Sequence, residues 1–504
     1  MALSDILVFT MSAVIFRLVF GTLRVFLPGA GDRWRGWLLL VASILAVYWL
    51  QPPLPIRYID FWLPTLTLLL VFLCWLVTAP REKRFARENL ATIGLLVITI
   101  LATGMTRYLS ISGVITPSRP PEIWQVALLL VVVALLVGTL RVFLPGAGLL
   151  LRFPRSAATV PGITIFLLLF LFIILKLPAL TLAASAGLRG LMGQSGSMAN
   201  ATDLRWLGFS YVAFRLIHTL RDRQTGRLPA VSLREYLVYV IFFPSFTAGP
   251  IDRLERFVKD LRQPMGLSSP GQLHPECSDE DFAVAGRRLL MGLFKKFALA
   301  DGLALVALNA INAPQVQSTG WMWIVLYAYS LQIYLDFSGY TDIAIGLGRL
   351  LGIRLPENFN QPYLKPNLTQ FWNNWHMTLT QWLRAYFFNP VTRSLRSARR
   401  PMPPMTVLFI TQVSSMLLIG LWHGITWNFA LWGLWHGIGI FAQNRWSDWI
   451  RPRVTGLDAH PWFKNGFAAA GTLLTFHYVT LGWVWFALPD LTLAGQVFQR
   501  LFGL

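Results

Sequence analysis

The segment LQIYLDFSGYTDIAIGLGRLLGI, residues 331–353, is a hydrophobic run of membrane-span length that nevertheless contains two aspartates. A carboxylate at bilayer depth is costly, so it normally faces a bundle interior or a water-filled cavity. Asp336 and Tyr340 are four residues apart, and so are Ser338 and Asp342. On a helix this spacing gives two polar stripes. We therefore predict a helix that has protein or water on more than one side.

The next segment, PENFNQPYLKPNLTQFWNNWHMTLTQWLRAYFFNP (356–390), combines proline, asparagine and aromatic residues with a helical pattern. Trp372, His376, Thr380 and Arg384 recur at every fourth position, which predicts one helix face that carries an imidazole and a guanidinium. An interfacial amphipathic helix with an aromatic belt would also fit this pattern.

A second histidine follows in LWHGITWNFALWGLWHG, residues 421–437. His423 lies in another apolar span, and Gly424 would let a neighbouring helix approach the backbone. A single intramembrane histidine is about as often a structural hydrogen-bond partner as a functional group. Two histidines in neighbouring segments that carry polar residues favour a catalytic role over a structural one.

The composition is that of an integral membrane protein. Of 504 residues, 55% are hydrophobic and 13% charged, and the mean hydropathy is +0.55. The length accommodates about ten to twelve spans of roughly 20 residues each. Lys and Arg exceed Asp and Glu to give a net charge of +20. These residues lie mostly in short loops between spans, so attraction to anionic lipid headgroups explains the charge better than binding of nucleic acid does. Two cysteines indicate neither a disulfide framework nor a metal site.

Six apolar segments precede this region, and we expect them to be spans: 6–27, 36–51, 61–79, 90–107, 122–144 and 160–184. Their first, third and fifth connecting loops carry eight Lys and Arg residues, whereas the second and fourth carry three. The positive-inside rule then places the amino terminus outside the cytoplasm. The amino-terminal sequence predicts no removable signal peptide.

The segment GTLRVFLPGAG occurs twice, at 21–31 and at 138–148, and each copy closes a hydrophobic span. We attach no catalytic role to the repeat. A small-residue, polar stretch near 185–203 marks a division between amino-terminal helices (1–190) and a core (205–500).

Several motifs in order resemble the membrane-bound O-acyltransferase family. DFSGYTDIAIGLGRLLGIRLPENFNQPY, FWNNWHMTLTQWL and LWHGITWNFALWGLWHG carry the likeness, with FFPSFTAGPIDR (242–253) and GLFKKFALAD (292–301). The sequence is similar to the bacterial branch that serves alginate O-acetylation and teichoic-acid D-alanylation. The resemblance implies an all-α polytopic membrane protein. We expect about eleven transmembrane helices, with re-entrant or interfacial helices, around a central funnel or tunnel.

The resemblance also implies roles for particular residues. His423 matches the family's catalytic histidine, a general base for an acceptor hydroxyl, and His376 matches a second position that orients a substrate or supports an oxyanion. Lys295 and Lys296 would lie near a donor entrance, with snorkelling as the plain alternative. For Asp336 and Asp342 we favour structural roles over catalysis. The residues expected to line the substrate path are Asp336, Ser338, Tyr340, Asp342, Trp372, Asn373, Asn374, Trp375, Thr380, Arg384, Trp422, Trp427 and His436.

The sequence contains no G-x-S-x-G elbow, Walker loop or dinucleotide fingerprint. We therefore expect no bound cofactor or metal. The resemblance implies a thioester donor, either acyl-CoA or acyl carrier protein; direct transfer is the simplest mechanism, and relay through a partner stays open. By resemblance, the acceptor is a hydroxyl of an extracytoplasmic polysaccharide or envelope glycan, and a periplasmic or surface-bound acetyltransferase is a possible partner. The location would be the bacterial cytoplasmic membrane. Acylation of a lipid or glycolipid, and a transporter without chemistry, remain open as alternatives.

Overall fold

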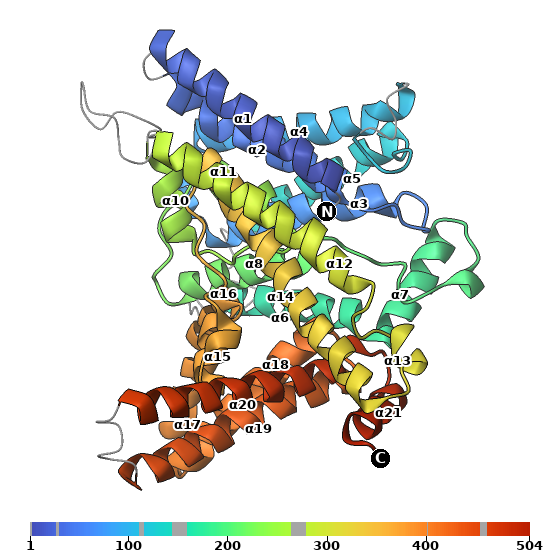
Figure 1. Ribbon diagram of the computed structural model, residues 1–504. Helices are drawn as coiled ribbons and strands as arrows, with labels where there is room; N and C mark the ends of the chain where they lie inside the picture. Colours follow the sequence, from blue (N-terminus) through green and yellow to red (C-terminus); the bar gives the residue numbers. More distant parts are fainter. Residues whose placement is uncertain are drawn as a thin grey trace. The chain divides into compact units, whose positions relative to one another are not determined.

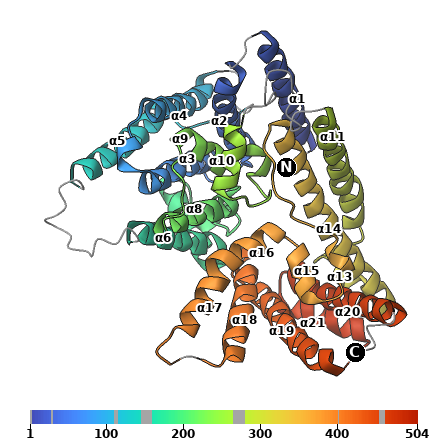
Figure 2. The same cartoon turned by 90° about the vertical axis from the view of Figure 1, so that its left-hand side faces the viewer.

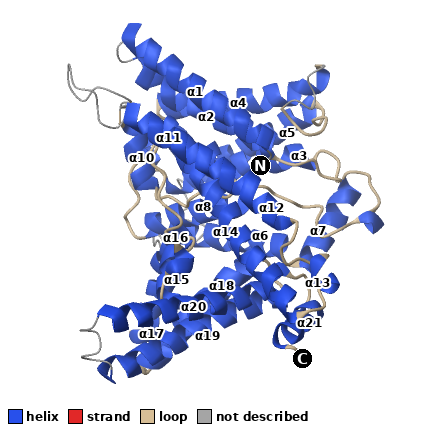
Figure 3. Ribbon diagram, viewed as in Figure 1, coloured by secondary structure: helices blue, strands red, loops and turns tan. Residues whose placement is uncertain are grey.

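A computed structural model describes residues 3–26, 30–109, 115–143, 159–263, 279–400, 402–453 and 461–504. Every regular element within these ranges is a helix (Figures 1 and 3), which confirms the predicted all-α class. The chain forms two compact units, residues 1–282 with 347–354, and residues 283–346 with 355–504. The predicted boundary between residues 190 and 205 does not coincide with the limits of these units and stays a prediction.

The described residues of the first unit form the following α-helices: α1 (Leu3–Phe26), α2 (Ala30–Leu50), α3 (Ile59–Thr78), α4 (Arg87–Met105), α5 (Ile123–Phe143), α6 (Thr159–Lys176), α7 (Pro178–Leu191), α8 (Phe209–Gln224), α9 (Leu233–Ile241) and α10 (Leu254–Arg262). Helix α9 lies at its centre, because α2, α3, α4 and α8 all pack against it. Its residues 236–241 are at most 1% exposed. The Tyr236 hydroxyl, buried there, is 2.7 Å from the Thr219 hydroxyl.

Five of the six expected amino-terminal spans correspond to single helices, α1 to α5. The sixth, 160–184, is wrong as one helix because the chain breaks at Leu177 between α6 and α7. Pro178 follows directly, and a proline disfavours the helical conformation in the residue before it. Leu177 accordingly has φ −91° and ψ 112°.

In both copies of the repeated segment the chain is helical up to the last residue described before a gap, Phe26 in α1 and Phe143 in α5. The residues that follow, 27–29 in the first copy and 144–148 in the second, lie outside the described residues.

The second unit holds most of the remaining helices: α11 (Asp279–Leu293), the π-helix η6 (Phe294–Ala300), α12 (Asp301–Ala304), α13 (Asn312–Gln315), α14 (Thr319–Leu350), η7 (Pro362–Leu364), α15 (Leu368–Asn374), α16 (Met377–Leu383), the π-helix η8 (Arg384–Phe388), α17 (Asn389–Arg396), α18 (Pro404–His423), α19 (Trp427–Ile450), α20 (Pro461–Ala487) and α21 (Leu491–Phe502). Helix α11 begins, and α14 ends, in residues of the first unit. Helices α18 and α19 lie side by side (Figures 1 and 2), and α20 packs on α19.

Helix α14 carries the two aspartates, and α11 with η6 packs closely along it. A β-carbon on Gly292 would stand 2.6 Å from the carbonyl oxygen of Gly339. A β-carbon on Gly346 would stand 2.8 Å from the side chain of Leu289. Glycines at both contacts therefore allow the two helices to approach until their polar side chains can meet.

Among the described residues, five helices are long and apolar enough to cross a membrane: Ile59–Thr78, Arg87–Tyr108, Thr159–Lys176, Pro404–His423 and Pro461–Ala487. These helices agree with the predicted membrane class. The larger number of about eleven spans, and the funnel, stay predictions.

Candidate functional site

His376 lies in a sharp turn between α15 and α16, where Asn358 holds it. The imidazole is 4% exposed and Asn358 is fully buried. Nδ1 of His376 is 3.0 Å from Oδ1 of Asn358. The same Oδ1 accepts from the backbone N–H of Thr378 at 3.2 Å and from its hydroxyl at 2.8 Å. The segment before α15 thereby fixes the start of α16.

The predicted continuous helix through this region is wrong. His376 has φ 44° and ψ 52°, a left-handed conformation that is unusual for a residue with a β-carbon. The backbone N–H of Met377 donates to the carbonyl oxygen of Asn358, at 2.9 Å, instead of continuing a helix. Tertiary hydrogen bonds thus override the four-residue spacing from Trp372 to Arg384.

The two short helices remain tied together across the break. The Thr380 hydroxyl donates to the carbonyl oxygen of Trp372 at 3.2 Å, and the Arg384 guanidinium donates to Oδ1 of Asn373 at 2.8 Å. Asn374 donates to the carbonyl oxygen of Gln370 in its own helix, at 2.8 Å. Arg384 and Asn373 are exposed.

His423 is the last residue of α18, and its side chain is half-buried. Aromatic rings surround it: Trp422 at 4.5 Å between ring centroids, Phe486 at 4.7 Å and Trp432 at 5.8 Å. Gly424 follows, and a β-carbon there would stand 2.8 Å from the ring of Phe429. The end of α18 is therefore packed against α19, as the WHG motif predicts.

Trp422 is a common neighbour of the two histidines. Its ring centroid lies 6.1 Å from that of His376 and 4.5 Å from that of His423. Phe337 of α14 also packs edge-on against His376, with 4.8 Å between centroids. The second unit thus brings the three sequence-predicted residues Trp422, His423 and His376 into one aromatic region.

His436, on α19, is more deeply buried than His423. It is fully buried, with the ring of Trp432 at 5.0 Å and that of Trp372 at 5.1 Å. A β-carbon on Gly482 would stand 2.6 Å from its Nε2, so α20 also lies against this imidazole. Trp432 packs against both His436 and His423 and so lies between them. The sequence interpretation did not include this residue.

Trp375 belongs to a neighbouring aromatic cluster. It packs against Phe371, Phe359 and Trp483, with 5.5, 5.2 and 5.2 Å between ring centroids. Trp427, by contrast, begins α19 and is 76% exposed.

The charged residues of α14 are engaged in ion pairs. Oδ2 of Asp342 is 2.7 Å from Nζ of Lys295, and Oδ1 pairs with Arg288. Asp336 pairs with Lys296. These pairs join η6 and α11 to α14, and the structural role of the two aspartates stays a prediction. Lys295 and Lys296 therefore have their charges balanced inside the unit, and the donor entrance stays a prediction.

Two further polar residues of α14 lie beside these pairs. Ser338 is 4% exposed and Tyr340 is 6% exposed. Both are thus buried at the centre of the helix. Their expected contact with substrate stays a prediction.

Sequence reasoning missed Asn358, Trp432 and Phe486. Asn358 stands in the quoted ENFNQPY motif, yet no spacing rule connects it to a histidine 18 residues later. Trp432 lies four residues before His436, and that spacing was the available signal for it.

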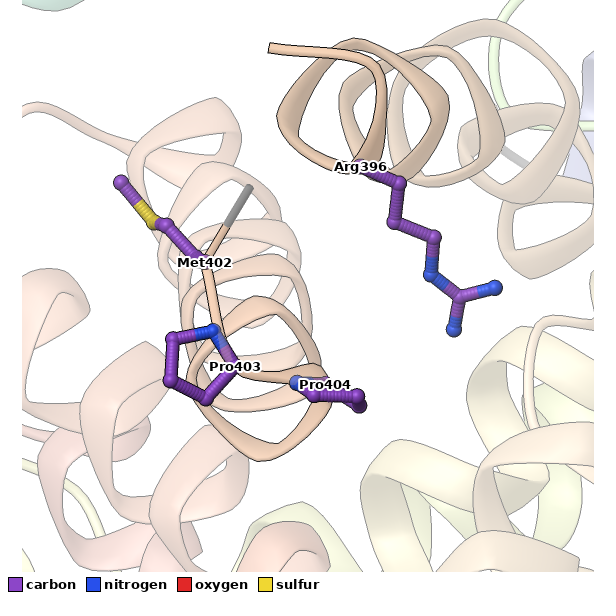
Figure 4. Close-up of a pocket in the computed structure, with 4 residues that line it drawn as sticks. All are labelled: Arg396, Met402, Pro403 and Pro404. Carbon is purple, nitrogen blue, oxygen red and sulfur yellow. The ribbon is translucent and has the colours of Figure 1, made fainter. Parts of the chain in front are cut away.

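A separate surface hollow lies at the other end of α18, lined by Arg396, Met402, Pro403 and Pro404. Figure 4 shows the Arg396 side chain across the gap from the two prolines. Pro404 and His423 are the two ends of this 20-residue helix, which is roughly 30 Å long at 1.5 Å per residue. The hollow is therefore distinct from the histidine region. No group of three potential metal ligands occurs in the described parts of the chain.

Comparison with known proteins identifies the class. The profile of the membrane-bound O-acyltransferase family matches residues 158–482, and the chain belongs to this family. The match begins at α6, so it includes helices that we had assigned to the amino-terminal region. It contains all three histidines described above.

Individual relatives share this region. A probable alginate O-acetylase of Pseudomonas aeruginosa is 34% identical over 298 residues, 59% of this chain and 51% of the relative. A teichoic acid D-alanyltransferase of Streptococcus thermophilus is 30% identical over 299 residues, 56% and 68% respectively. A peptidoglycan O-acetyltransferase of Helicobacter pylori is 30% identical over 273 residues, 54% and 47%. The matched region thus spans about half the length of the first and third relatives.

Proposed function

We propose that this protein is an O-acyltransferase that moves an acyl group, in the first place acetyl, from a thioester to a hydroxyl. The hydroxyl oxygen attacks the thioester carbonyl, the new C–O bond forms and the C–S bond breaks. The hydroxyl proton passes to a histidine and then to the departing sulfur, so that the products are an ester and a free thiol.

The observation that carries the proposal is the position of His423. Its half-buried imidazole ends an apolar helix among Trp422, Trp432 and Phe486. An imidazole that contacts a hydroxyl can accept its proton and return it to a leaving group. His423 is thus the proposed general base.

The relatives' names guide the choice of substrates. They specify alginate, teichoic acid and peptidoglycan, which are polymers of the cell envelope. We propose an envelope glycan as acceptor and acyl-CoA or acyl carrier protein as donor, supplied from the cytoplasm. A periplasmic or surface-bound acetyltransferase would complete delivery. The chain would lie in the bacterial cytoplasmic membrane with its amino terminus outside the cytoplasm.

Transfer of labelled acetyl groups tests the proposal. Purified protein in nanodiscs would receive radiolabelled acetyl-CoA or acetylated carrier protein, with and without an envelope-glycan fraction. We expect thioester cleavage and label transfer, reduced about 10²–10⁴-fold in His423→Ala. His477→Gln is the matched control. It replaces a histidine that is not the proposed base: His477 lies on α20, with its Nε2 2.9 Å from the hydroxyl of Tyr327.

Two outcomes would redirect the proposal. Label on lipid instead of glycan would favour glycolipid acylation. No cleavage of either donor by folded wild-type protein would contradict the enzyme assignment and favour a transporter. Full activity of His423→Ala would contradict the role of His423 as the general base.

A further inference from the structure

The orientation of the Asn358 amide follows from one neighbour. The backbone N–H of Thr378 points at the side-chain oxygen from 3.2 Å, and a backbone N–H can only donate. The amide atom at this position must therefore be Oδ1 and not Nδ2. The Thr378 hydroxyl, at 2.8 Å, donates to the same oxygen.

The orientation of the amide determines the protonation of His376. Oδ1 of Asn358 is an acceptor only, so Nδ1 of His376, 3.0 Å away, must carry a hydrogen. His376 lies in a turn outside the candidate spanning helices, and burial lowers the pKa of its imidazole to about 3. The ring is neutral, and Nε2 is consequently an unprotonated acceptor.

This acceptor has no partner among the described residues. Nε2 of His376 and Nδ2 of Asn358 are both buried without a hydrogen bond. A buried polar atom left unpaired is unfavourable, and so is a left-handed backbone at a residue with a β-carbon. Strain and an unpaired acceptor at one residue together indicate a site that a ligand completes.

We infer that Asn358 is a positioning residue that fixes the Nδ1–H tautomer of His376 and so presents Nε2 as a hydrogen-bond acceptor to the substrate. The inference rests on the proposed function for the identity of the substrate. A neutral His376 in this tautomer does not donate from Nε2, so it does not support an oxyanion. Of the two roles left open by the sequence, orientation of a substrate is the one that the geometry favours.

The substrate group that pairs with Nε2 is an O–H or an N–H donor. A hydroxyl of the glycan acceptor supplies the first, and an amide of the arm that carries the thioester supplies the second. The two sources predict different kinetics. Loss of Nε2 raises KM for the glycan in the first case and KM for the thioester in the second.

Nitrogen NMR of ¹⁵N-histidine-labelled protein in nanodiscs tests the tautomer without any need for turnover. Subtraction of the His376→Gln spectrum isolates the His376 signals. We expect one protonated nitrogen, coupled to its hydrogen, and one unprotonated nitrogen at pH 7. A protonated Nε2 in the wild-type protein would overturn the inference, whether or not the protein cleaves a thioester.

The pH profile of kcat/KM tests the positioning role. In Asn358→Asp the oxygen acceptor remains, but its negative charge favours the imidazolium, so the acid limb should move upward by about one pH unit or more. Asn360→Asp is the matched control, since Asn360 is exposed two residues away. Equal profiles for these two variants would contradict the positioning role, whereas inactive wild-type protein would contradict only the proposed function.

Discussion

The α-carbon of Gly433 in α19 lies against the backbone of α18, so that a β-carbon there would stand 2.6 Å from the carbonyl oxygen of Met416. The reciprocal contact occurs at Gly420 of α18, where a β-carbon would stand 2.1 Å from the carbonyl oxygen of Phe429. Backbone atoms cannot yield as a flexible side chain can. These two glycines therefore set the separation of the helices on either side of His423.

Gly433→Ala should destabilise the protein, because the added methyl group forces α18 and α19 apart. We expect a loss of about 1–3 kcal/mol, measured as a lower melting temperature in detergent, together with weaker acyl transfer. Gly466→Ala in α20 is the control, since a β-carbon there meets nothing within 4 Å. Alanine also has a higher helix propensity than glycine, so the methyl group by itself should not destabilise α20. Equal melting temperatures for the two variants would refute the close-packing argument.

Asp342→Asn should destabilise the protein more than the same change at an exposed aspartate. Asp342 is 5% exposed and balances both Arg288 and Lys295. An amide therefore removes the carboxylate beside Lys295 and leaves Arg288 with Glu357 alone. We expect a loss of about 1–3 kcal/mol in unfolding free energy. Asp448→Asn, whose partner Arg445 is 2.8 Å away but whose side chain is 62% exposed, should lose at most about 1 kcal/mol. Similar melting curves for both variants would count against the structural role.

The sequence predicted the class of fold because its signals are local. Long apolar segments identify helices such as α3 and α18, and the aspartates within 331–353 indicate a helix that faces protein. The break at Leu177 was also accessible, since Pro178 restricts it. Two compact units were not predictable from local pattern, because contacts between distant segments define them.

The site was predictable in part. His423 and His376 stood out as polar residues in apolar surroundings, and the structure places both beside Trp422. The turn at His376 was hidden because a four-residue spacing resembles a helix, whereas its real conformation depends on Asn358. A left-handed residue that is not glycine leaves no mark in the sequence, since only its tertiary hydrogen bonds maintain it.

Tyr363→Phe should weaken the aromatic cluster beside the site. The Tyr363 hydroxyl donates to the carbonyl oxygen of Ser330 at 2.8 Å and accepts from Nε1 of Trp483 at 3.1 Å. Its removal leaves the Nε1–H of Trp483 without its acceptor and takes a second hydrogen bond from the Ser330 carbonyl, at a cost of about 1–3 kcal/mol.

Tyr334→Phe is the control for this change. Tyr334 packs in the same cluster, 5.6 Å between ring centroids from Tyr363, and its hydroxyl makes no hydrogen bond within the described part of the chain. Its loss should leave the melting temperature within about 1 °C of the wild-type value. A larger loss in Tyr334→Phe than in Tyr363→Phe would contradict the hydrogen-bond account.

Asp203→Asn should reveal a pH-dependent contribution to the first unit. Oδ2 of Asp203 accepts from the Ser185 hydroxyl at 2.7 Å, from Nε of Arg189 at 2.9 Å and from the backbone N–H of Asn200 at 3.0 Å. Burial alone would raise the pKa of this carboxyl, but the three donors outweigh it and hold the pKa below its ordinary value.

A carboxyl whose pKa is lowered by folding stabilises the native state above the pKa of the unfolded chain, about 4, and loses that contribution as the pH falls through the native value. Asp203→Asn should therefore cost about 2–4 kcal/mol at pH 7, and the deficit should shrink as the pH falls below 4. Melting temperatures across pH 3–8 measure this difference. Glu255→Gln, an exposed change in α10, should show no deficit at either end, and a deficit in Asp203→Asn that stays constant with pH would show that packing, not charge, is responsible.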